Sequence, residues 1–233
     1  MKIKLLTTFS TACLILSTAC GGGGNEDIAN VTFSEGLSSD GKSIAEKFIN
    51  TVILGGQISN IDIPDEFDLN GGVVISLNDE PLGYLESGIT INGDITVSTQ
   101  SPQTSSASIN GKLTYNFTNA SFLINNAKEA TLNGAAIHTI KANMSAEPNL
   151  ENPTSGEAEI TQDFTSDESI AITDDLTGSI KPNARMHKKA SMNNKQVEET
   201  TTCSGTITVI INEETQTCGL SEDCSGCKEN EDS

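Results

Sequence analysis

A repeat of alternating segments, marked by glycines about 22 residues apart, is the feature that most constrains this fold. Apolar and polar residues alternate on both sides of three Asn-Gly pairs, for example over residues 89–97 around Asn92-Gly93. The marking glycines are Gly71, Gly93, Gly111, Gly134, Gly156, Gly178 and Gly205. Alternation with a period of two is typical of strands that bury one face. The sequence therefore predicts a mainly β fold.

The Asn-Gly pairs predict how these strands are connected. Asn-Gly between alternating runs is a strong hairpin signal, because both central residues of a type I′ turn need positive φ. A period of about 22 residues then holds two strands and two turns of an antiparallel meander, although a β-solenoid with one coil per repeat also fits. We favour the meander, as a large curved sheet or a barrel with aliphatic residues on its buried face. His138 lies opposite Ile137 in this alternation, which predicts a place on the wet face.

One amphipathic helix is predicted before the repeats, over residues 43–54. Ser43 and Glu46 form a capping box at its start. An apolar stripe follows along one side of it, made of Ile44, Phe48 and Val52. A helix that lies on a membrane surface would carry a row of basic residues on the opposite side. Because this row is missing, we expect the helix to pack on the sheet.

The first 19 residues combine a basic start, an apolar run from Leu5 to Leu16 and small residues before Cys20. This order is typical of an export signal. Cys20 and the glycines after it resemble the lipobox of bacterial lipoproteins. The resemblance implies cleavage before Cys20, lipid on its thiol and a membrane partner reached through that lipid. With Gly21 next to the lipid site, it implies the outer membrane of a Gram-negative envelope. Ordinary cleavage after Ala19 is the alternative, and it would release a soluble protein.

Composition divides the rest of the chain and excludes one class of partner. Residues 20–36 are predicted to form a Gly-rich acidic tether, residues 37–211 the β-repeat domain and residues 212–233 an acidic Cys-rich tail. The formal net charge of −19 repels the phosphates of nucleic acids, so nucleic-acid binding is not expected. Aromatic residues make up only 4 % of the chain, so the core must be built mainly from aliphatic side chains.

Four cysteines follow the predicted lipid site: Cys203, Cys218, Cys224 and Cys227. An exported chain meets oxidising conditions, so we predict two disulfides, for which three connectivities are possible. Cys224 and Cys227 also have the spacing of thiol-redox proteins, but no helix follows them to lower a thiol pKa. A zinc site with four thiolates would need a second pair of this spacing.

No catalytic residue, metal site or cofactor is predicted. His138 and His187 are the two histidines of the chain, and no Gly-x-Ser-x-Gly elbow accompanies them. Acidic residues cluster before Gly71 and around Asp167, but neither cluster has the order of an EF-hand loop. These clusters are interpreted as a solvated acidic surface.

One stretch breaks the acidic pattern. Its basic residues are Lys181, Arg185, Lys188, Lys189 and Lys195, and they fall in the longest repeat. We interpret the first four as a docking loop for an anionic partner, either an envelope protein or an anionic glycolipid. A mobile loop that relieves self-repulsion is the alternative.

Together these features predict a non-enzymatic envelope lipoprotein, whose β-scaffold binds a partner. Two other functions stay open. One is a carrier that holds a lipid or another apolar ligand in a trough under the helix. The other is a thiol-redox protein that uses Cys224 and Cys227.

Overall fold

The fold is known from a computed structural model, which describes residues 34–54, 73–81, 88–101, 104–124, 128–146, 155–193 and 196–228. Helix α2 (Ser39–Phe48) continues directly into the π-helical segment η1 (Ile49–Leu54). The strands are β1 (Val73–Pro81), β2 (Ile89–Ser101), β3 (Thr104–Ile124), β4 (Lys128–Ala146), β5 (Ser155–Thr165), β6 (Ile170–Asp174), β7 (Gly178–Asn193), β8 (Gln196–Ile211) and β9 (Glu214–Gly219). The prediction of a mainly β fold is confirmed.

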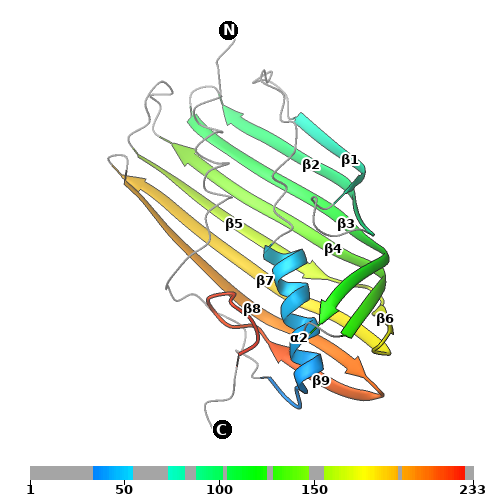
Figure 1. The fold of residues 1–233 in the computed structure, drawn as a ribbon. Helices are drawn as coiled ribbons and strands as arrows, with labels where there is room; N and C mark the ends of the chain where they lie inside the picture. The colour runs from blue at the N-terminus through cyan, green and yellow to red at the C-terminus, as the bar shows by residue number, and fades with distance from the viewer. Residues whose placement is uncertain are drawn as a thin grey trace.

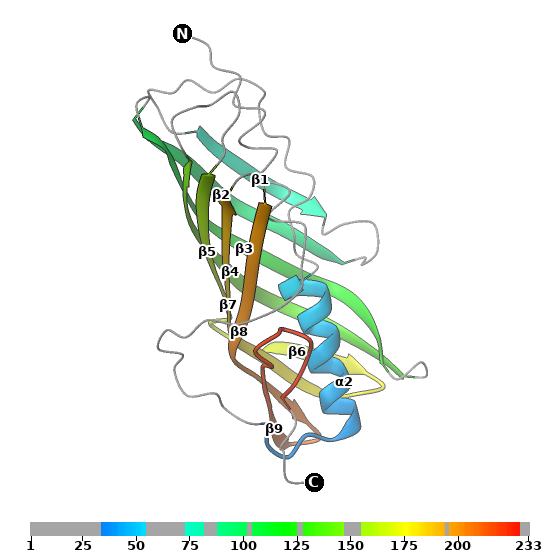
Figure 2. The ribbon, with the colours of Figure 1, turned by 90° about the vertical axis from the view of Figure 1, so that its left-hand side faces the viewer.

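All nine strands belong to one antiparallel sheet, in the order β1-β2-β3-β4-β5-β7-β8-β9. The short strand β6 lies beside this path and pairs with both β4 and β7. Apart from β5 and β6, strands that follow each other in the chain therefore lie side by side, as Figure 1 shows. This arrangement is the predicted meander and not a solenoid. The sheet is curved, and the helix lies on its inner side (Figure 2).

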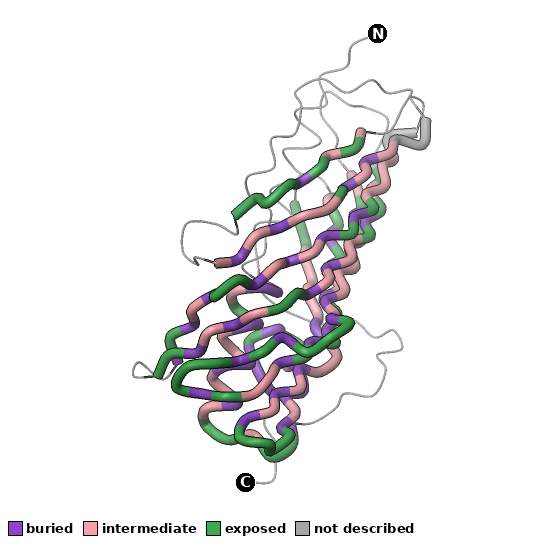
Figure 3. Tube along the Cα trace, turned by 90° about the vertical axis from the view of Figure 1, so that its right-hand side faces the viewer, coloured by how far each residue is buried: buried purple, intermediate pink, exposed green. Residues whose placement is uncertain are grey.

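Burial alternates from residue to residue along the strands (Figure 3). We call the face that carries Leu113, Phe164 and Ala184 the inner face, because it looks towards the helix and holds the core. The outer face carries their neighbours in the chain, such as Lys112 and Asp163, and is rich in Thr, Ser, Asn and charged residues. The two faces therefore have the chemistry that the alternation predicts.

The N-cap of helix α2 is Ser38, whereas the sequence predicts a capping box that starts at Ser43. The Ser38 hydroxyl accepts a hydrogen bond from the backbone N–H of Gly41 at 3.1 Å. A distant residue fixes this cap: the backbone N–H and the hydroxyl of Ser38 both donate to Oε1 of Gln216 in β9, at 2.9 Å each. Because Gln216 is 178 residues away, local sequence cannot reveal this start.

The apolar stripe of the helix packs on the inner face, which confirms the predicted packing. Ile44, Phe48 and Val52 have no exposed surface. The Phe48 ring lies against the Phe117 ring of β3, with 5.9 Å between the ring centroids. Helix α2 also contacts β8 and β9, so it joins the middle of the sheet to its last strands.

The Asn-Gly pairs do not form the predicted hairpin turns. Asn92-Gly93 lies inside β2, and the pairs at 110–111 and 133–134 lie inside β3 and β4. Gly93 has φ of 134°, and a Cβ built there would lie 2.2 Å from the carbonyl oxygen of Lys112. The glycine is therefore needed where β2 bends and approaches β3 closely. A turn with positive φ at both central residues does occur, at Asn212 and Glu213 between β8 and β9.

Candidate functional site

A buried polar network on the inner face is the most chemically distinctive feature among the described residues. His138 of β4 lies between Leu113 of β3 and Phe164 of β5 in the strand register. Its Nδ1 is 3.1 Å from the Tyr115 hydroxyl, and its Nε2 is 2.8 Å from Oε1 of Gln162. An amide oxygen only accepts, so Nε2 carries the proton and Nδ1 accepts the hydroxyl proton of Tyr115. The imidazole ring also stacks on Phe164, with 4.1 Å between the ring centroids.

Burial sets the protonation state of this network. Removal of water disfavours the charged imidazolium and lowers the pKa of His138 to about 4, although Gln162 and the charge of Asp163 oppose the shift. Burial likewise raises the pKa of the Tyr115 hydroxyl well above its ordinary value. His138 is 1 % exposed and Tyr115 is fully buried. The network is therefore neutral near pH 7, with His138 and Tyr115 closed to solvent and Gln162 partly exposed at its end.

A closed network of this kind fixes strand register more readily than it performs chemistry. Tyr115, His138 and Gln162 come from three adjacent strands, and each lies on the inner face. A shift of one residue would turn the members of the shifted strand to the outer face and break their hydrogen bonds. The prediction that His138 lies on the wet face is wrong. His138 does lie opposite Ile137, but Ile137 is the residue that faces outward.

We expect the folded protein to lose stability as the pH falls from about 6.5 towards about 4. Over this range the unfolded chain binds a proton at His138. The folded chain does not, because burial lowers the pKa of His138 in the folded state. The full difference corresponds to about 3 kcal/mol in the free energy of unfolding. Urea unfolding across this pH range measures it. His138→Gln should flatten the pH dependence. Equal slopes for the His138 variant and the wild type would contradict the assignment.

A second polar pair interrupts the apolar inner face. Lys188 of β7 and Glu199 of β8 form an ion pair at 3.3 Å, with side chains only 7 % and 17 % exposed. Ile160 lies directly across from Lys188 on β5. A buried charge is tolerated when it is paired, and loss of one partner is then strongly destabilising. The pair is consistent with a structural role in joining β7 to β8.

The basic residues predicted to form a docking loop lie in strand β7, not in a loop. Lys181, Arg185 and Lys189 are on the outer face, whereas Lys188 points to the inner face. The reason is the pairing of β7 with β5 and β8 over its length, which forces neighbours in the chain to opposite faces. The structure therefore does not bring the four residues together.

Acidic residues of β5 already neutralise much of this outer row. Arg185 donates two hydrogen bonds to the carboxylate of Asp163, at 2.6 and 3.1 Å. Oε1 of Glu159 forms an ion pair with Lys189 at 3.7 Å and lies within hydrogen-bond distance of Nε2 of His187, at 2.9 Å. Exposed pairs of this kind contribute little stability, but they leave less charge for an external anion.

The four predicted disulfide cysteines form two bonds, and both join the tail to a strand. Cys203 of β8 pairs with Cys224, and Cys218 of β9 pairs with Cys227. The prediction of two disulfides is confirmed, and the structure selects one of the three connectivities. Cys224 and Cys227 are not bonded to each other. In this state all four sulfurs are used, so neither a CxxC dithiol nor a tetrathiolate exists.

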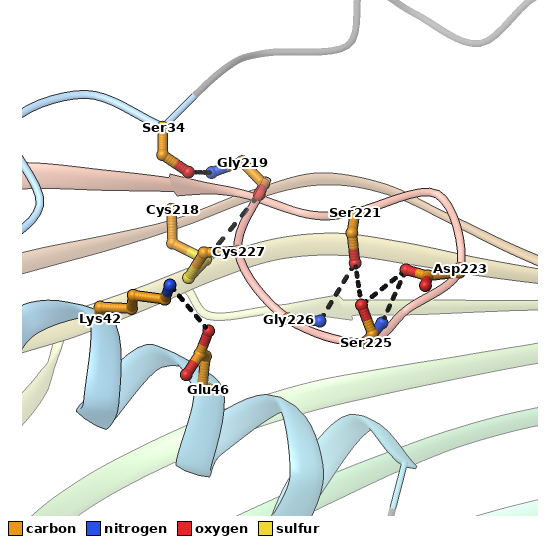
Figure 4. A network of polar contacts seen from close by, with 10 residues as sticks. All are labelled: Ser34, Lys42, Glu46, Cys218, Gly219, Ser221, Asp223, Ser225, Gly226 and Cys227. Carbon is orange, nitrogen blue, oxygen red and sulfur yellow. Dashed lines mark hydrogen bonds and ion pairs between the residues drawn. A yellow bond between two sulfur atoms is a disulfide. The ribbon is translucent and has the colours of Figure 1, made fainter. Parts of the chain in front are cut away.

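Residues 220–228, after β9, fold into a compact loop over helix α2, and we call this loop the knuckle (Figure 4). The Ser221 hydroxyl accepts from the N–H of Gly226 at 3.1 Å, and Asp223 accepts from the N–H and the hydroxyl of Ser225. Hydrogen bonds from the Ser221 hydroxyl, first, and from the N–H and hydroxyl of Ser225 lower the pKa of the Asp223 carboxyl. A Cβ built on Gly226 would lie 2.9 Å from Oε1 of Glu46, so the knuckle sits directly on helix α2.

Three kinds of feature bear on contact with a membrane or a metal ion: the predicted lipid anchor, membrane-spanning helices and metal-binding clusters. Cys20, the export signal and most of the tether lie outside the described residues. None of the described helices is long and apolar enough to cross a membrane. In the same part of the chain, no three His, Cys, Asp or Glu side chains gather closely enough to hold a metal ion.

The sequence signals for the buried network were weak. Tyr115 and His138 each occur in an alternating run, and the alternation does not indicate whether a polar ring faces the core or the solvent. Gln162 lies 24 residues from His138, and only the register of β4 and β5 brings them together.

No protein-family model, curated protein or solved structure matches this chain.

Proposed function

We propose that the protein is an exported, lipid-anchored and non-enzymatic scaffold, which offers its sheet to a partner protein in the cell envelope. The observation that carries this proposal is the difference in access between the two faces. Even polar side chains of the inner face are buried: His138 is 1 % exposed and Lys188 is 6 % exposed, whereas Lys112 and Arg185 of the outer face are exposed. Other molecules therefore meet the polar outer face and the strand edges. These surfaces are suited to protein recognition by hydrogen bonds and strand pairing.

Two disulfides in the last strands support an exported location, because such bonds persist in oxidising compartments. The charge pattern favours a protein over an anionic glycolipid as the partner. Arg185 and Lys189, which would bind an anion, are each paired with a carboxylate of β5.

The carrier alternative is less well supported by the packing. It needs a trough under the helix, and there Ile44, Phe48 and Ile49 have no exposed surface. Phe48 packs directly on Phe117. An apolar ligand would have to displace the helix.

Mass spectrometry of the mature protein, expressed with its own export signal in a Gram-negative host, tests the anchor. We expect a chain that begins at Cys20 and carries acyl groups. Cys20→Ala should be the matched control without lipid. A chain that begins at an unmodified Cys20 would replace the anchor by plain secretion.

Extraction of the purified Cys20→Ala protein with organic solvent tests the scaffold against the carrier. Stoichiometric release of a lipid from it would support the carrier instead.

A further inference from the structure

The two edges of the sheet are closed to different degrees. Residues before the helix cover the free side of β9. The N–H of Glu35 donates to the carbonyl of Thr217 at 2.9 Å, and the N–H of Thr217 donates back at 3.0 Å. In the part of the chain that the structure describes, no strand or bridge pairs with the free side of β1. An edge with unpaired N–H and C=O groups is a template for another strand.

The first half of β1 has the composition of a pairing strand. Residues 73–77 read Val-Val-Ile-Ser-Leu, with no charge and no proline. Val73 and Ile75 lie opposite Val97 and Ile95 of β2 and continue the apolar inner face to the edge. Val74, on the outer face, is 59 % exposed.

The second half of β1 is protected against pairing. The register with β2 shifts between Leu77 and Glu80, and Asp79 has φ of 54°. Asp79 and Asn92 hold this irregularity by two reciprocal hydrogen bonds, at 2.8 and 2.9 Å. Pro81 ends the strand. A bulge, acidic side chains and a proline are the usual means of blocking an edge, so the open template is confined to residues 73–77.

We propose that a second copy of this chain pairs with residues 73–77, antiparallel and about a two-fold axis, and joins the two sheets edge to edge. This pairing rests on the scaffold function proposed above and names the partner protein as another copy. A second copy fits because its own β1 has the matching alternation, with apolar residues inside and Val74 and Ser76 outside. The template is uncharged, so the two copies bring no like charges face to face.

The two-fold geometry limits this assembly to two copies. A two-fold interface uses the same patch on both molecules and removes both free β1 edges at once. On the other edge, the Glu35–Thr217 bridge covers β9, and the part of β8 that extends beyond β9 carries the exposed charge of Glu198. Charged side chains on an edge disfavour the addition of another strand there.

The net charge of each copy and the short template, residues 73–77, predict a weak association that strengthens with salt. Each copy has a formal net charge of −19, which opposes approach at low ionic strength. Salt screens this repulsion while backbone hydrogen bonds and apolar contacts persist. An interface based on ion pairs would show the opposite salt dependence. Lipid anchors on one membrane would raise the effective concentration of the two copies.

Sedimentation velocity on the full chain with Cys20→Ser, over a wide concentration series, tests the pairing without lipid. We expect a monomer–dimer equilibrium that tightens with salt. Val74→Lys should weaken it by roughly tenfold or more, because the two-fold pairing brings the two introduced lysines close together on one face of the new strand pair, where like charges repel. Leu123→Lys is the matched control: Leu123 is 61 % exposed and lies in β3, away from β1. This variant should associate like the wild type.

Hydrogen exchange of the amides in residues 73–77 separates the remaining outcomes. Protection that grows with protein concentration in the wild type, and not in Val74→Lys, supports the dimer. Protection in a protein that stays monomeric at every concentration means that the chain itself covers the edge, and it overturns the proposal. A dimer that Val74→Lys leaves intact also overturns it, because another surface then forms the interface. These results are independent of the lipid test at Cys20.

Discussion

Loss of both disulfides is expected to lower the free energy of unfolding by about 6 kcal/mol, the largest effect that we predict. The Cys203–Cys224 bond closes a loop with a sequence separation of 21, and the Cys218–Cys227 bond closes one of 9. The loss of chain entropy in the unfolded state gives about 3 kcal/mol for each, with the longer loop contributing slightly more. Without them the knuckle over helix α2 has little apolar surface to hold it.

Urea unfolding of paired variants measures this effect in the Cys20→Ser background. The pairs are Cys203→Ala with Cys224→Ala, and Cys218→Ala with Cys227→Ala, each compared with the fully oxidised protein. Combining the two pairs should lower stability further than either alone. If the combined variant unfolds at the urea concentration of the oxidised protein, the bonds have no stabilising role.

Phe48→Ala is expected to cost about 4 kcal/mol in the free energy of unfolding. The Phe48 ring has no exposed surface and packs on Phe117 in the middle of the sheet. Its removal leaves a cavity between the helix and β3, and both sides of that cavity are held by backbone hydrogen bonds. The surrounding residues therefore have little freedom to collapse into the space.

The exposed Asn50 offers a matched control on the neighbouring helical segment. Asn50→Ala should change stability by less than about 0.5 kcal/mol. Phe48→Leu, which keeps most of the volume, should fall between the two. Calorimetry or urea unfolding of the three variants gives the comparison. Equal stabilities for Phe48→Ala and Asn50→Ala would show that the helix does not contribute to the core.

The Asn-Gly pairs illustrate why strands were predicted better than their connections. Alternation on both sides of Gly93 correctly indicates extended chain, because period two is a local property of the backbone. The same dipeptide was misread as a turn. Gly93 is instead required where β3 approaches within 2.2 Å of a would-be Cβ. That constraint comes from a residue of another strand, Lys112, so it has no local signal.

The helix and the basic stretch show the same contrast between local patterns, which the sequence reveals, and features that distant residues set. The apolar stripe around Phe48 was read correctly, because a spacing of four residues places side chains on one side of a helix. Its first residue was misplaced, because Gln216 fixes Ser38. Lys188 and Lys189 were grouped as one docking loop, but strand pairing separates them onto opposite faces of the sheet.

The sequence by itself determined the class of structure: antiparallel strands that bury one face, one helix packed on them, and cysteines paired with each other. These follow from local periodicity and from the chemistry of thiols in an exported chain. Only the tertiary structure decided where the helix begins, which cysteines pair, and that Tyr115, His138 and Gln162 meet. The physical reason is that these outcomes depend on strand register, which is set by contacts between residues far apart in the chain.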